Sequence, residues 1–77
     1  MTGDERKRAF KVAVAKRGQT LSAAALLWCG VTWEHLSRGI SDEYDTPLSA
    51  DVKQKFATVI DRSVEDVFGS SNTEHAA

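Results

Sequence analysis

The chain has 77 residues, which is enough for one small domain with a single core and too few for a large enzyme pocket. At this size folding buries only about 60% of the surface of the unfolded chain, so a compact helical bundle or a dimer is expected. The net charge of −1 hides an asymmetry: residues 1–40 hold seven Lys or Arg against three Asp or Glu, and residues 41–77 hold three against eight. A basic half is typical of a nucleic-acid-binding surface, although solvated helix faces give the same pattern.

The first predicted helix covers residues 4–17. Thr2 and Glu5 are spaced as a capping box at its start. Phe10 and Val14, one turn apart, are expected to face the core.

The second predicted helix, residues 21–29, follows the helix-ending Gly18 and takes Thr20 as its N-cap. It is apolar on almost every side, so Leu27 and Trp28 are hard to bury together with the rest. Either the fold covers these two side chains or they face a partner.

A glycine turn leads from this helix into the third. Gly30 accommodates a positive φ without strain, and Thr32 is the expected N-cap of a helix over residues 32–40. Leu36 and Ile40 point inward. An apolar helix, a glycine turn and a short polar helix predict a helix-turn-helix, whose second helix enters the major groove of DNA.

The second half is expected to close the core. Residues 41–45 form an acidic loop, and further helices begin after the N-caps Ser49 and Ser63. Their inward-facing residues are Val52, Phe56, Val59, Ile60, Val64, Val67 and Phe68. Residues 70–77 carry no core-forming side chain and are expected to form a disordered tail behind a domain of residues 1–69.

Two segments resemble the phage repressor and Cro family of lambda-repressor-like DNA-binding domains. The first is Gly18-Gln19-Thr20, then the second helix and Gly30-Val31-Thr32…Leu36-Ser37-Arg38; the second is Asp51-Val52-Lys53-Gln54-Lys55-Phe56-Ala57…Ser63-Val64-Glu65-Asp66-Val67-Phe68-Gly69. The resemblance implies an all-α fold of five helices with a helix-turn-helix formed by the second and third. It also implies a sequence-specific regulator of transcription that binds double-stranded DNA, of phage or bacterial origin.

The chain departs from the family pattern at four places. Leu26 stands four residues before the turn glycine, where the family has alanine, and Gly39 replaces a packing hydrophobe. Leu21 and Ser22 stand where a phosphate-binding glutamine is common, and the loop 41–45 is acidic where the family's loop approaches the DNA backbone. These departures concern how the domain docks on DNA more than its fold.

The outward face of the third helix carries the candidate base-reading residues, which are Thr32, Trp33, Glu34, Ser37 and Arg38. Arg38 suits guanine O6 and N7, and Glu34 either accepts from cytosine N4 or holds Arg38 in an i, i+4 pair, which we expect as its resting role. Trp33 offers apolar area to a thymine methyl or its indole N–H to a phosphate, or it belongs to the core. We expect His35 to be a partly buried helix residue and no metal ligand.

Contacts to the DNA backbone are expected from the start of the second helix and from the first helix. The candidates are Thr20, Ser22, Lys16, Arg17, Arg6, Lys7, Arg8 and Lys11. Family members usually bind as homodimers to paired half-sites, whereas this sequence leaves monomer and dimer open.

Other classes of function fit less well. The acidic half and the apolar Leu27 and Trp28 favour, as the alternative, a protein-interaction module such as an antirepressor or antitoxin. An enzyme is not expected, because the acidic loop has no nucleophile–base pair beside it. The single Cys29 excludes an internal disulfide and a cysteine-based zinc site, and no apolar run approaches the roughly 18 residues of a membrane span. We therefore expect a cytoplasmic protein without cofactor, metal or membrane contact.

Overall fold

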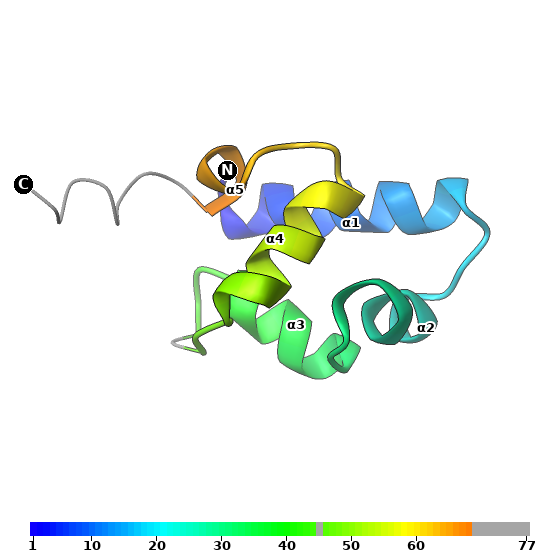
Figure 1. Cartoon of the computed structure of the whole chain (residues 1–77), viewed down its shortest axis with the longest axis horizontal. Helices are drawn as coiled ribbons and strands as arrows, with labels where there is room; N and C mark the ends of the chain where they lie inside the picture. Colours follow the sequence, from blue (N-terminus) through cyan, green and yellow to red (C-terminus); the bar gives the residue numbers. More distant parts are fainter. Residues whose placement is uncertain (45, 69–77) are drawn as a thin grey trace, which may run out of the picture.

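The computed structural model describes residues 1–44 and 46–68, and in this part of the chain it is helical without a strand (Figure 1). The elements are α1 (Gly3–Lys16), α2 (Leu21–Ala24) running directly into the π-helix η1 (Ala25–Cys29), α3 (Trp33–Ile40), α4 (Ala50–Val59) and α5 (Val64–Phe68). With α2 and η1 taken as one continuous helix, these are the five helices that the sequence predicts. The predictions for Asp45, Gly69 and residues 70–77 lie outside the described residues.

Each helix starts where a hydroxyl side chain accepts a hydrogen bond from the backbone N–H three residues later. The donor–acceptor distances are 3.1–3.2 Å, and the capping residues are Thr2, Thr20, Thr32, Ser49 and Ser63. The capping box of α1 is complete, because the carboxylate of Glu5 accepts from the backbone N–H of Thr2 at 2.8 Å. All five predicted N-caps are thus confirmed.

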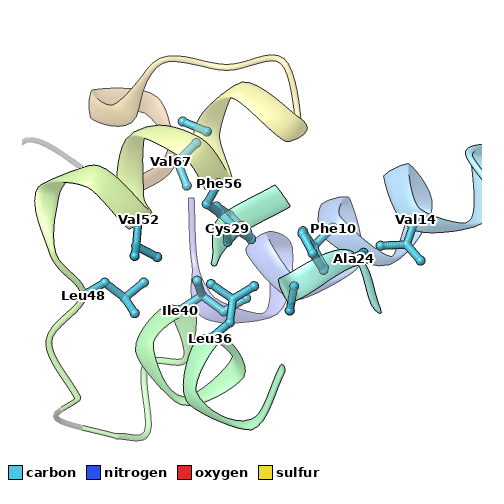
Figure 2. Close-up of a cluster of buried hydrophobic side chains, with 12 residues drawn as sticks. Phe10, Val14, Ala24, Cys29, Leu36, Ile40, Leu48, Val52, Phe56 and Val67 are labelled. Carbon is cyan, nitrogen blue, oxygen red and sulfur yellow. The ribbon is translucent and has the colours of Figure 1, made fainter. Parts of the chain in front are cut away.

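The core is built around Phe10 of α1 (Figure 2). Its ring stacks on Phe56 and Trp33 at centroid distances of 5.4 and 5.5 Å, and Trp28 meets it edge-on at 6.2 Å. Val14, Leu36, Ile40, Val52 and Val67 are buried as predicted, while Val59, Ile60, Val64 and Phe68 pack against the core and remain partly exposed. The core therefore draws on every helix of the described chain.

The space beside Gly39 is filled by Leu48. A Cβ atom on Gly39 would lie only 2.3 Å from a methyl carbon of Leu48, whose side chain is buried. The packing hydrophobe missing from α3 is thus supplied by the segment leading into α4 (Figure 2).

The side chain of Arg6, expected to contact DNA, instead binds the rest of the domain. Its guanidinium donates to the backbone carbonyls of Val67 and Ile40, both at 2.7 Å, and lies 3.4 Å from a carboxylate oxygen of Asp42. Only 11% of the side chain is exposed, so its packing does not favour the predicted contact to a phosphate. The carbonyls at the ends of α3 and α5 are hydrogen-bonded through it instead.

The acidic loop contributes to the start of α1. The second carboxylate oxygen of Asp42 accepts from the backbone N–H of Gly3 at 2.8 Å, and a Cβ on Gly3 would lie 2.6 Å from the backbone nitrogen of Asp42. Asp42 thereby satisfies one of the N–H groups that a helix leaves unpaired at its N-terminus.

Acid is expected to destabilise the fold partly through Asp42. The hydrogen bond from Gly3 and the charge of Arg6 lower the pKa of this carboxyl below its ordinary value of 3.8. The pKa of Asp42 is lower in the folded protein than in the unfolded protein. Its contribution to stability is therefore complete above about pH 4 and is lost as the pH falls through the folded-state pKa. Urea midpoints measured between about pH 5 and pH 2 should therefore fall less steeply for Asp42→Asn than for the wild type. Glu43→Gln, a neighbouring change without a side-chain partner among the described residues, should retain the wild-type dependence; an equal slope in Asp42→Asn would contradict the assignment.

Candidate nucleic-acid interface

The connection between η1 and α3 is a tight turn of three residues. Gly30 has φ 75° and Thr32 caps α3, while the half-buried side chain of Val31 packs on the core. Figure 1 shows α2 and η1 beside α3 along the lower edge of the molecule. The turn therefore presents the start of α3 at the surface.

The π-helix η1 explains the leucine at the expected alanine position. Its last N–H, that of Gly30, is directed at two carbonyls, that of Ala25 five residues back, as in a π-helix, and that of Leu26 four residues back. The wider turn holds one extra residue, so Ala25 is fully buried five positions before the glycine and Leu26 is 57% exposed. The small residue that close helix packing needs is thus present, displaced by one position.

Deletion of Leu26 is expected to convert η1 into an α-helical turn and leave the domain folded. Ala25 then stands four residues before Gly30, still on the buried face, and urea unfolding should show a loss of about 1 kcal/mol or less. The matched control deletes the exposed Gln54 from α4, which rotates Val52 by about 100° relative to the rest of that helix and should prevent folding. Unfolding of the Leu26 deletion to the same extent as the control would show that η1 does not hold an extra residue.

The exposed face of α3 is not the one expected at every position. Glu34, Arg38 and Thr32 are exposed, as their candidate roles require, whereas Ser37 is half-buried and its hydroxyl donates to the carbonyl of Glu34 at 3.1 Å. Trp33 is also half-buried, and its ring lies nearly parallel to that of Phe10, with an angle of 8° between the planes. The alternative that Trp33 belongs to the core is therefore the one the packing favours, and only its uncovered part is available to DNA.

His35 is exposed, contrary to the expectation that it is partly buried. The angular spacing along the helix could have predicted this. At about 100° per residue, Trp33 points within about 20° of the inward-facing Ile40, whereas His35 points about 140° away from it. Spacing from Leu36 and Ile40 together thus assigns Trp33 to the core side and His35 to the solvent side of α3.

Arg38 is held between two neighbours. Its guanidinium lies 3.5 Å from the carboxylate of Glu34 and 5.9 Å from the ring centroid of Tyr44. The pair with Glu34 is the predicted resting role of that glutamate, and both side chains are more than half exposed, so the pair costs little to open. Tyr44 was missed because it lies beyond the helix, in the acidic loop.

The remaining backbone candidates lie on different surfaces. Thr20 and Ser22 are exposed at the start of α2, Lys11 is exposed, and Lys7 is half-buried. The other three, Arg8, Lys16 and Arg17, line a groove between α1 and the end of α4. The sequence predicts backbone contacts from all of them, whereas in the fold three of the seven line this groove and the other four do not.

The described residues contain no metal-ligand cluster of three or more His, Cys, Asp or Glu side chains. Cys29 is buried, and burial raises the pKa of its thiol to about 11. No described helix has the length and apolar character needed to cross a membrane. No family model, curated protein or solved structure matches the chain.

Proposed function

We propose that the chain is a sequence-specific double-stranded DNA-binding regulator of the Cro or small-repressor type, with a lambda-repressor-like domain and α3 as its recognition helix. The observation that carries the proposal is the polar, solvent-exposed side of a short capped helix that follows a glycine turn: Thr32, Glu34, His35 and Arg38. Such a helix fits the major groove, where its exposed side chains reach base edges.

Arg38 is the principal base-reading residue of the proposal. Its guanidinium has five donors in a planar fork that matches the two acceptors of guanine, and the exposed pair with Glu34 opens at little cost on binding. On binding DNA, Glu34 either stays paired with one side of the Arg38 guanidinium or accepts a hydrogen bond from cytosine N4. His35 adds a second exposed polar side chain in the first turn of α3, whereas Arg38 lies in its last turn.

Backbone contacts come from the N-terminus of α2 and from α1. Thr20 uses its hydroxyl oxygen to cap α2, which leaves the hydroxyl proton free for a phosphate oxygen. Ser22 and Lys11 are further exposed donors. These contacts give affinity that falls with salt and carry no sequence information.

The experiment is a selection of bound duplexes from a random pool, followed by titration of the enriched duplex at several salt concentrations. We expect one enriched motif, with palindromic symmetry if the chain binds as a dimer. Lys11→Ala should weaken binding to all duplexes equally and lower the salt slope by about one unit, while Arg62→Ala, on the connection after α4, should change neither. A pool without enrichment and an affinity independent of salt would refute the proposal.

A second candidate function is a protein-interaction module of the antirepressor or antitoxin kind. The observation in its favour is that Leu26 and Leu27 are 57% and 70% exposed next to one another on η1. Two large apolar side chains in contact with water are a common feature of binding surfaces. The same duplex selection separates the two candidate functions, because a protein-interaction module predicts no enriched duplex. It also predicts that the substitution Leu27→Ser abolishes binding to the protein partner.

A further inference from the structure

A groove runs along the side of α1 that faces the end of α4 and the connection to α5. Its apolar floor consists of Ala9, Val12, Ala13, Val59 and Ile60. Val12 is 48% exposed, although Phe10 and Val14 on the same helix are buried. The proposed recognition helix makes no part of this groove.

A second hollow extends the groove toward η1. Arg17 and Val59 line both hollows, and Trp28 lines the second. The guanidinium of Arg17 lies 5.1 Å from the ring centroid of Trp28, which fixes the aromatic ring at the junction. The two hollows therefore meet at Arg17 and Val59, and the second adds the ring of Trp28 together with the polar Gln54, Lys55 and Thr58.

The edges of the groove are mainly basic. Arg8, Lys16 and Arg17 lie on the α1 side and Arg62 on the opposite side, and none of the four forms an ion pair with the described residues. The acidic residues at the groove are Glu5 and Asp61, and the carboxylate of Glu5 is already engaged by the backbone of Thr2. The opposite side carries both Asp61 and Arg62, so an occupant with an apolar stripe and negative charge toward the α1 side would match this arrangement.

The dimensions fit a helix. The groove follows α1 from Glu5 to Arg17, and 12 steps of about 1.5 Å give a length of about 18 Å, which is that of a three-turn helix. Nucleic acid would satisfy the cations but leave Val12, Ile60 and Trp28 against a polar backbone. An amphipathic helix covers the apolar floor and pairs the cations at once.

We propose that this groove binds an acidic amphipathic helix of a second protein. In Figure 1 the connection after α4 runs along the upper edge beside α1, whereas α3 lies along the lower edge. The bound helix would therefore leave α3 free, and a partner could be carried to DNA without competing for the recognition helix.

The probe is a synthetic peptide of about four helical turns, with leucines at i, i+3, i+4 and i+7 and glutamates at most other positions. It is titrated into the full ¹⁵N-labelled chain, and a peptide of the same composition with scattered leucines is the control. We expect saturable shifts of the backbone amides of residues 8–17 and 59–62 and of the Trp28 indole, with weak or no shifts from the control peptide.

Two substitutions test the contacts. Val12→Glu should lower the affinity for the peptide by about tenfold or more, because it puts an unpaired charge into the apolar floor. The exposed position of Val12 keeps the fold intact. Lys16→Glu should weaken it severalfold by charge repulsion, while the identical change Lys11→Glu, outside the groove, should not.

Three results would overturn the proposal. These are equal shifts from the scattered peptide, saturation of the same amides by a DNA duplex in place of the peptide, and no saturable shift up to about 1 mM peptide, a concentration at which even weak specific complexes form. None of them depends on whether α3 binds DNA, so this inference and the proposed function can fail separately.

Discussion

Replacing Phe10 with alanine is expected to lower the free energy of unfolding by about 3–5 kcal/mol. The ring is fully buried and touches three other aromatic rings, those of Trp28, Trp33 and Phe56. A domain of this size has a total stability near the lower end of about 5–15 kcal/mol, so a substantial part of the variant should be unfolded at 25 °C.

Urea unfolding followed by circular dichroism at 222 nm measures this loss. Val12→Ala is the matched control, because it shortens a 48% exposed side chain of the same helix and should change stability by about 0.5 kcal/mol or less. The stack on Trp33 also positions α3, so the folded fraction of Phe10→Ala should bind DNA more weakly than the wild type. A loss below about 1.5 kcal/mol would contradict the central place given to this ring.

Replacing Arg38 with alanine is expected to remove the preference for one base pair of the selected motif. A bidentate contact to guanine contributes about 1–3 kcal/mol of discrimination, which corresponds to about 5–150-fold in relative affinity. Circular dichroism should be unchanged, because the side chain is exposed and pairs only with Glu34 and Tyr44 among the described residues.

The measurement is duplex selection with the variant, compared with Lys11→Ala. Arg38→Ala should select duplexes without a base preference at one position of the motif. Lys11→Ala should select the same motif as the wild type and bind it with lower affinity. An unchanged motif in Arg38→Ala would show that this residue does not read bases.

The sequence alone predicts the elements and most of the core. Each N-cap is a local signal, since Thr20 or Ser49 bonds an amide only three residues away. The inward face of α1 follows from the one-turn spacing of Phe10 and Val14. These features depend on neighbours within a turn or two, so periodicity and capping chemistry suffice to predict them.

Contacts between distant segments could not be predicted in this way. Arg6 bonds carbonyls that are 34 and 61 residues away, so its sequence context shows only a cation on a helix. Likewise the groove arises where α1 meets residues 59–62, and nothing near Arg8 or Lys16 indicates it. The extra residue at Leu26 is visible as a misplaced leucine, but the π-turn that accommodates it is not.

The most direct test of the account is a titration of the ¹⁵N-labelled chain with the selected duplex, mapped by backbone amide shifts. We predict that the largest shifts occur in residues 20–23 and 32–38, at the start of α2 and along α3, and that they weaken as salt is raised. Shifts confined to residues 8–17 and 59–62, or no saturable shift at any salt concentration, would contradict the assignment of α3 as a recognition helix.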